Sequence, residues 1–426
     1  MPKANIYILT MFSKIHDLIR DGKAKSKHMV ETHPNLYGHI QVGELNLRAH
    51  SAEFHHRQKT TTPITPSSQP KTALTSSDTS DFVIAKGDVI TRLTLELELK
   101  TDENFTATGV DTTLYTVLDC INSFDIYAEG TSTTICTVES ADMLVAFADQ
   151  DRNKYLRAER AICGHPAGSV NADFVASESR TVFINLPRNI IVDNELFSHG
   201  IENGFTIRVN WNSKSWLGLQ GVSINRVRLL SETYKYDQSI RDRMIANYAA
   251  GPRMDFNFMA PAIQRGGAQT IKTNELITIQ LTNVSGLMTD MVIIARVKGS
   301  ALDDSPLYIS NVVLKNASNV SELGTYGELS HAYVSDVMNS DLDKYQPDTI
   351  LPSDAFYRLP ISENPHKHAE IGSVGGYIDM DGKHSLEFVC KAATTADVEI
   401  TFTILYSKVA TFSVERGKTA VVYSSK

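Results

Sequence analysis

Several short segments carry residue types that could bind a ligand or perform chemistry. Arg416-Gly417-Lys418-Thr419 contains the Gly-Lys-Thr of a phosphate-binding loop. That motif also needs a glycine five residues before Gly417, where the backbone must curl around the phosphates. Position 412 is Phe412 instead, and no helical pattern follows. We therefore interpret the segment as the solvated end of a C-terminal strand.

Two histidine pairs and one acidic turn could hold a metal ion. His55-His56 and His366-Lys367-His368 lack the Cys or carboxylate cluster that would complete a ligand set, so loop positions are favoured. Asp379-Met380-Asp381-Gly382 is similar to the start of a calcium loop, but Cys390 stands where the bidentate Glu belongs. A tight hairpin turn is the favoured interpretation, with calcium between subunits as the open alternative. We expect no metal and no cofactor.

Motifs of the common enzyme classes do not occur. The sequence contains no G-x-S-x-G, H-E-x-x-H or G-x-G-x-x-G, and no spacing singles out a carboxylate pair for glycoside hydrolysis. We therefore expect no catalytic residues. The four cysteines form no C-x-x-C pair, which excludes a zinc ribbon and a thioredoxin-type site. Such sparse cysteine is typical of a reducing cytoplasm, although a Cys120–Cys136 bridge across a hairpin stays open.

Composition and net charge further limit the classes of protein to which the chain could belong. The 426 residues are 42% hydrophobic and 21% charged, which is enough apolar content for two or three domains. The net charge of −8 makes the chain a poor general binder of nucleic acid, because phosphate contacts need clustered Lys and Arg. No run of 18 apolar residues and no cleavable signal pattern is present.

The first thirty residues differ from the rest of the chain. Apolar residues recur every three or four positions, and basic residues crowd the other side, which predicts an amphipathic helix. The residues expected to face a membrane or the underside of a shell are Ile8, Met11, Phe12, Lys14, Ile15, Leu18, Ile19, Arg20, Lys23, Lys25 and Lys27. From the residues alone, a short helix packed on the body is favoured over an interfacial helix on an anionic membrane.

A Thr/Ser/Pro-rich stretch follows this N-terminal segment. Residues 59–81 contain almost no apolar side chains, so they cannot bury enough surface to offset the entropy of ordering. We predict an extended linker or arm there.

β-patterns dominate after residue 82. Leu93, Leu95, Leu97 and Leu99 alternate with polar residues, which predicts a strand with one buried face. Similar alternation covers 277–281 and 398–404, and further strands are expected at 123–127, 181–186, 205–211, 226–230, 291–297, 308–314 and 386–390. Helical patterns are short and fall at 141–148, 240–248 and 329–338. The fold class is therefore all-β with short inserted helices.

Two halves of the chain share an order of features. Val89-Ile90-Thr91 is matched with Leu276-Ile277-Thr278, and a strand ending in Leu-Pro occurs near Leu186 and again near Leu359. Each Leu-Pro precedes two further strands, at 205–211 and 227–234 or at 386–390 and 398–406. The matching order predicts two copies of one β-domain.

Each copy has room for about eight strands, and packing them into two sheets suits a jelly roll. The expected domains are an N-terminal helix and arm (1–58), a linker (59–82), jelly roll 1 (83–250), a connector (251–265) and jelly roll 2 (266–426).

The whole arrangement resembles a known group of proteins. Two tandem jelly rolls behind a basic amphipathic helix and an arm are similar to the double jelly-roll major capsid proteins of tailless icosahedral viruses with an internal membrane, best known from bacteriophages. Three short segments add to the resemblance through their local sequence. They are Leu118-Asp-Cys-Ile-Asn-Ser-Phe-Asp-Ile-Tyr127, Phe183-Ile-Asn-Leu-Pro187 and Leu359-Pro-Ile-Ser-Glu-Asn364.

The resemblance implies a structural protein of the virion, assembled in the host cytoplasm. Such chains form homotrimers whose six lobes tile a pseudo-hexagonal lattice beside neighbouring trimers, penton proteins and minor capsid or membrane proteins. The N-terminal segment lies on the internal lipid membrane, so no direct contact with nucleic acid is expected.

Two other functions compete with this interpretation. One is a carbohydrate-binding or glycan-cleaving double β-sandwich, for which Trp211 and Trp216 offer little aromatic surface. The other is a phage tail or baseplate protein, although the fibrous repeats common in such proteins are absent.

Overall fold

The computed structural model describes the strands, the short helices and the turns of two β-domains. The described residues are 58–67, 78–105, 117–128, 134–140, 143, 161, 174–186, 190–193, 196–213, 215–236, 238–250, 253–266, 269–271, 275–282, 284–297, 308–318, 321–324, 356–361, 377–380, 384–391 and 398–423.

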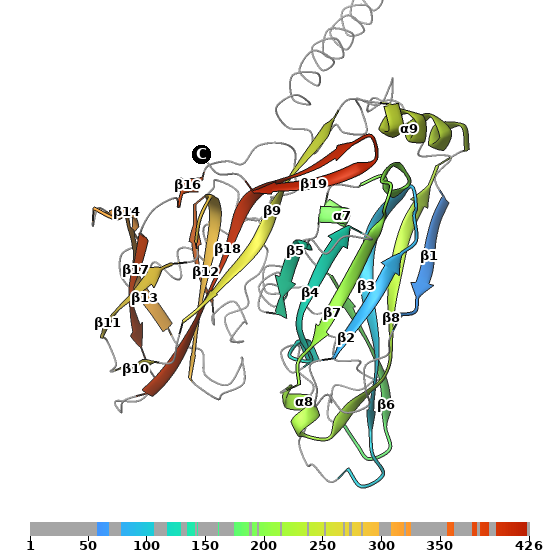
Figure 1. Ribbon diagram of the computed structural model, residues 1–426. Coiled ribbons are helices and arrows are strands. Elements are labelled where there is room, and N and C mark those ends of the chain that lie inside the picture. Colours follow the sequence, from blue (N-terminus) through green and yellow to red (C-terminus); the bar gives the residue numbers. More distant parts are fainter. Residues whose placement is uncertain are drawn as a thin grey trace, which may run out of the picture.

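Domain 1 is a sandwich of two four-stranded antiparallel sheets (Figure 1). One sheet has the order β1-β8-β3-β6 and the other β2-β7-β4-β5, which is the strand order of a jelly roll. The strands are β1 (Gln58–Ile64), β2 (Thr79–Ile84), β3 (Val89–Thr101), β4 (Ile121–Ala128), β5 (Thr134–Glu139), β6 (Ser179–Asn185), β7 (Phe205–Trp211) and β8 (Val222–Lys235).

Alternating side chains hold these two sheets together. Leu93, Leu95, Leu97 and Leu99 of β3 are all buried in the core between the sheets, as the period-2 pattern predicts. On the opposite face of β3, Glu96 forms ion pairs with arginines of β8. The regular alternation of apolar and charged residues therefore determines which face of β3 points toward the core.

Short helices close the ends of domain 1. They are α7 (Ile190–Asp193), the 3₁₀ turn η1 (Ser198–Gly200), α8 (Trp216–Leu219) and α9 (Gln238–Ala250). The helix predicted at 240–248 is confirmed by α9. Tyr248 of α9 is fully buried against Phe197, with ring centroids 5.5 Å apart.

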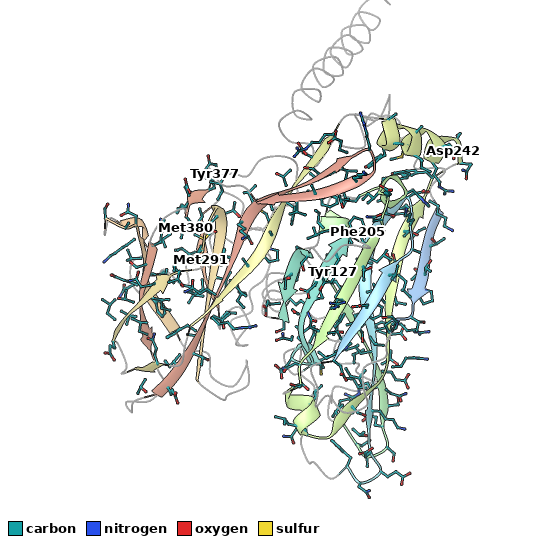
Figure 2. All side chains as sticks on the ribbon, in the orientation of Figure 1. Tyr127, Phe205, Asp242, Met291, Tyr377 and Met380 are labelled. Atoms are coloured by element: carbon teal, nitrogen blue, oxygen red, sulfur yellow. The ribbon has the colours of Figure 1, made fainter. Side chains whose placement is uncertain are left out.

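Domain 2 repeats the topology of domain 1. Its sheets have the orders β9-β18-β12-β15 and β11-β17-β13-β14, with β10, β16 and β19 as additional strands. Its elements are β9 (Met254–Arg265), β10 (Gln269–Ile271), β11 (Leu276–Leu281), β12 (Leu287–Val297), β13 (Tyr308–Lys315), β14 (Ser321–Gly324), β15 (Phe356–Pro360), β16 (Ile378–Asp379), β17 (His384–Lys391), β18 (Val398–Glu415) and β19 (Lys418–Tyr423). Figure 2 shows Met291 and Met380 in this domain; both belong to its core.

The shared order confirms two jelly rolls and corrects one detail of the repeat. The Leu-Pro strands do correspond, because β6 and β15 occupy the same place in their sheets. The matched triplets do not, because Val89 begins β3, the third strand of domain 1, whereas Leu276 begins β11, the second core strand of domain 2. Alternating strands resemble one another locally, so the triplets matched without being equivalent.

Strands also occupy two segments that we expected to be spacers. Within the predicted linker, β1 pairs with β8 through Gln58–Ile64, and β2 begins at Thr79. Backbone hydrogen bonds and β-branched Thr side chains hold β1 at the edge of its sheet, where little apolar burial is needed. The predicted connector 251–265 likewise contains β9, which pairs with β18 from Met254 to Arg265.

The two domains share an apolar interface. Strand β12 is buried on both faces: Met291 and Ile293 belong to the core of domain 2, whereas Val292 and Ile294 belong to the core cluster that includes domain 1. Phe412 of β18 lies 6.0 Å from Phe205 of β7 between ring centroids. One continuous hydrophobic core therefore joins the domains.

Candidate functional site

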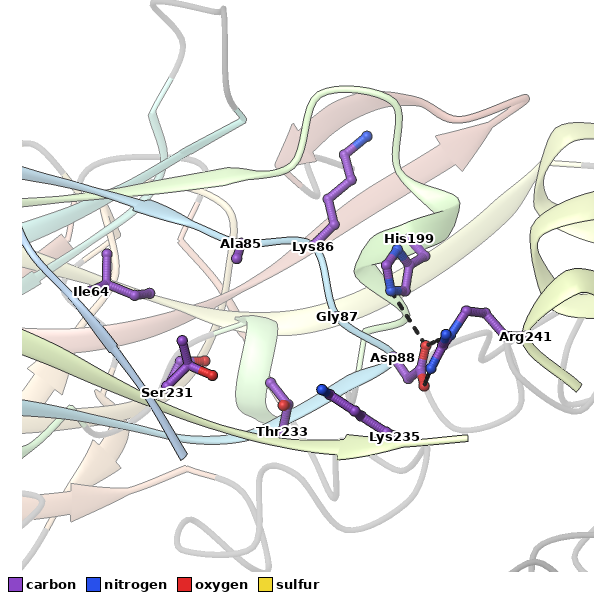
Figure 3. A pocket seen from close by; sticks show the side chains of 11 residues that line it. Ile64, Ala85, Lys86, Gly87, Asp88, His199, Ser231, Thr233, Lys235 and Arg241 are labelled. Carbon is purple, nitrogen blue, oxygen red and sulfur yellow. Dashed lines mark hydrogen bonds and ion pairs between the residues drawn. The ribbon is translucent and has the colours of Figure 1, made fainter. Parts of the chain in front are cut away.

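The described part of domain 1 contains a polar pocket of about 360 Å³ at one end of the sandwich (Figure 3). One wall comes from β8, whose alternate residues Ser231, Thr233 and Lys235 share a face. The remaining lining comes from β1, from the turn between β2 and β3, from η1 and from α9, through Thr62, Ile64, Ala85, Lys86, Gly87, Asp88, His199 and Arg241.

A buried carboxylate organises the inner end of the pocket. The side chain of Asp88 is fully buried, and Arg241 holds it in a bidentate pair with Nε–Oδ1 and Nη2–Oδ2 distances of 2.7 and 2.8 Å. The backbone N–H of Tyr236 also donates to Oδ2, and His199 Nε2 lies 3.5 Å from Oδ1. Asp88 thereby ties α9 and η1 to the start of β3, because its negative charge is fully matched by neighbours.

His199 is a weak base in this setting. Partial burial lowers the pKa of His199 below its ordinary value, and the positive charges of Arg241 and Lys86 act in the same direction. Asp88 opposes the shift without reversing it. At neutral pH the imidazole is therefore uncharged, and Arg241 alone neutralises Asp88.

The Arg416-Gly417-Lys418-Thr419 segment forms the turn of the β18–β19 hairpin. Arg416 and Gly417 both have positive φ, of 51° and 78°, as a two-residue type I′ turn requires. The turn docks on domain 1, where the N–H of Glu202 donates to the carbonyl oxygen of Gly417 at 2.8 Å. The prediction of a solvated C-terminal strand end is therefore corrected: the segment is a turn between two strands, with β19 starting at Lys418, and Gly417 is buried.

Other polar contacts fix the interface between the domains. Within domain 1, Lys86 Nζ donates to the carbonyl oxygen of Glu202 at 2.6 Å, which braces the segment that receives the docked turn. Arg265 of β9 forms an ion pair with Glu139 of β5. Burial raises the pKa of Glu139, an effect that the charge of Arg265 opposes.

The remaining candidate residues separate into described and undescribed groups. Cys120 and Cys136 are both buried, and no disulfide joins them. Asp379 ends the short strand β16, and the N–H of Met380 donates to the carbonyl oxygen of Gly286. Within the described residues, no cluster of three or more His, Cys, Asp or Glu could hold a metal ion.

Several predictions fall on residues outside the described part of the chain. These are the two histidine pairs, the helices at 141–148 (apart from Met143) and 329–338, and every N-terminal position expected to face a membrane, from Ile8 to Lys27. Among the described residues, no helix is long and apolar enough to cross a bilayer.

Sequence reasoning missed the cluster of Asp88, His199 and Arg241. Asp88 lies more than a hundred positions before the other two residues in the chain, and His199 and Arg241 belong to different elements, so no local spacing connects the three. The only local signal is the turn at Lys86-Gly87-Asp88, and a short turn of this kind does not by itself indicate a site.

Comparison with solved structures establishes the architecture. The PBCV-1 virus capsid structure matches with a TM-score of 0.62 at 10% identity, over 86% of this chain and 97% of that one. The chain has the double jelly-roll fold. The Faustovirus major capsid protein matches at a TM-score of 0.54 and 9% identity, over 87% of this chain and 91% of the other.

The mavirus major capsid protein is also similar, with a TM-score of 0.51 and 10% identity over 86% of this chain and 90% of the other. No protein-family model and no curated protein matches the sequence. The double jelly roll therefore rests on three-dimensional similarity and on the repeated strand order within the chain itself.

Proposed function

We propose that this chain is the major capsid protein of an icosahedral virus. One observation carries the proposal: the duplicated jelly-roll topology extends over nearly the whole length of the viral capsid proteins that the chain resembles. The proposed role is structural, so the protein would act through surfaces that bind copies of itself. Its place is the virion, after assembly in the host cytoplasm.

The proposed building block is a homotrimer. Two similar lobes in each chain give six lobes around a threefold axis, and six lobes tile a hexagonal lattice with neighbouring trimers. Penton proteins and minor capsid or membrane proteins would complete the shell.

The N-terminal segment is the proposed contact with an internal lipid membrane. Its basic residues would attract anionic headgroups at about 1 kcal/mol each at most, and its apolar face would add burial. A membrane between shell and genome also agrees with the net charge of −8, which disfavours direct contact with nucleic acid.

Mass measurement tests the trimer directly. Purified full-length protein at micromolar concentration should give a particle of about three times 47.1 kDa, with a six-lobed outline by electron microscopy. A stable monomer across this concentration range would contradict the proposed function.

Truncation tests the membrane contact. Protein lacking residues 1–30 should still form trimers but should lose binding to anionic liposomes in co-sedimentation. A second variant, Phe12→Gln with Ile15→Gln, removes apolar surface while keeping every charge, and should bind more weakly than wild type at high salt. Equal liposome binding by all three proteins would rule out the membrane role.

A further inference from the structure

The pocket around Asp88 has a wall, formed by β8, that carries a hydroxyl group without a hydrogen-bond partner. Ser231 is only 3% exposed, and its hydroxyl makes no hydrogen bond although it lines the pocket. A buried hydroxyl without a partner costs free energy, so such a group usually has a ligand or a water molecule to bond. Thr233, also buried, presents a second hydroxyl on the same face of β8, where it pairs with Thr60 at 3.0 Å.

The charge balance of the pocket favours an anion. Asp88 is the only carboxylate among the described lining residues, and both of its oxygens are already matched by Arg241 and the N–H of Tyr236. Lys235 lies on the same wall as Ser231 and forms no ion pair within the described residues. One ammonium group therefore stands beside hydroxyl donors with no negative charge left to repel an incoming anion.

The donor types select among anions. Carboxylates are recognised best by the planar fork of an arginine, and Arg241, the one arginine in the part of the lining that the structure describes, already pairs with Asp88. A lysine ammonium acting as a point charge, together with Ser and Thr hydroxyls, is a set that suits phosphate oxygens. We propose that this pocket binds a phosphate group, with Lys235 and Ser231 as its principal ligands.

The position of the pocket suggests where that phosphate would come from. Gln58 pairs with Lys235, so β1 begins beside the pocket and the N-terminal segment joins the fold at the same end of domain 1. If that segment lies on a membrane, as the proposed function has it, the pocket faces the bilayer and a lipid headgroup is one source. A free phosphate compound is the other, and it does not depend on the proposed function.

Inorganic phosphate is the first probe. Full-length protein should show a rise in melting temperature with phosphate over chloride at matched ionic strength, and saturable binding by calorimetry. Lys235→Gln and Ser231→Ala should each weaken phosphate binding at least tenfold. Lys100→Gln is the matched control, because it removes the same charge from the exposed far end of β3 and should bind as wild type does.

The Ser231→Ala variant separates binding from folding. It removes a buried hydroxyl that has no partner, so without phosphate it should melt at the wild-type temperature or above. Equal phosphate responses in wild type, Ser231→Ala and Lys235→Gln would overturn the proposal.

Vesicles then distinguish the two sources. With a lipid headgroup as ligand, both variants should bind phosphatidic acid vesicles more weakly than wild type, while binding equally to vesicles of the same charge made with fatty-acid carboxylates. With a free compound as ligand, only the inorganic phosphate response changes. Trimer mass is recorded on the same samples, so loss of the trimer would count against the proposed function while phosphate binding decides the pocket.

Discussion

Gly200 and Tyr248 are packed so closely that no side chain fits between them. A methyl group added at Gly200 would lie 2.3 Å from Cγ of the Tyr248 ring, well inside van der Waals contact. Tyr248 is fully buried and belongs to α9, while Gly200 ends η1. The contact fixes α9 over the end of domain 1, next to the pocket.

We expect Gly200→Ala to destabilise the protein by about 1–3 kcal/mol, because overpacking forces the buried ring of Tyr248 to shift. Chemical denaturation measures the loss. Gly266→Ala is the control, since a methyl group there meets its nearest neighbour, Phe402 Cβ, at 3.4 Å. Equal stabilities of the two variants would show that α9 moves aside at no cost.

Phe412→Ala should uncouple the two domains. Phe412 is fully buried between Phe205 of domain 1 and Phe256 of β9, so its loss should cost about 3–5 kcal/mol and weaken the joint core. Calorimetry should then show two unfolding transitions in place of one. Phe388→Ala, inside the core of domain 2, should cost a similar amount without increasing the separation of the transitions.

The thiol of Cys120 should resist alkylation in the native protein. Burial, with a smaller contribution from Asp119, raises its pKa to about 12, so it stays protonated at pH 8. Iodoacetamide labelling followed by peptide mass spectrometry should modify Cys120 only after unfolding. Labelling of the native chain at the rate of the unfolded one would contradict the burial seen here.

Acid should lower the free energy of unfolding through protonation of His199, which lies beside Asp88. Because the pKa of His199 is lowered from 6.5 in the folded protein, the unfolded chain binds the proton more tightly. Stability from this group is present above pH 6.5 and is lost as the pH falls from 6.5 to the folded pKa. His199→Gln should therefore show a smaller loss of stability between pH 7.5 and pH 5 than wild type. An unchanged pH dependence would exclude His199 as its cause.

The strands with strict alternation were predictable, and those without it were not. The strand predicted at 205–211 coincides with β7, because its inward residues alternate with half-exposed ones. In β1, Thr60–Thr62 and Pro63 carry no such signal, since an edge strand is held by backbone hydrogen bonds to β8. Local composition therefore predicts a linker, whereas pairing with β8 makes this segment a strand.

Pro261 makes β9 difficult to predict as a strand. Proline cannot donate to a strand ladder, so its presence argues against a central strand. Strand β9 lies at the edge of its sheet and pairs only with β18 there, which leaves the proline nitrogen outside the ladder. The pocket was unpredictable for a different reason: Asp88 and Arg241 meet only after β2, β8 and α9 have packed.

The position of β18 late in the chain determines when the core of domain 1 can be completed during translation. This strand delivers Phe412 to the core around Phe205, although Phe412 is translated roughly 180 residues after the end of β8 (412 − 235). At about 5–20 residues per second, that end of the first jelly roll waits on the order of 10–35 s for its cover. Until then the apolar surface around Phe205 stays exposed, so a nascent chain lacks the completed domain 1 that other subunits would contact. The end of domain 1 around Phe205 is therefore covered only after β18 has been translated.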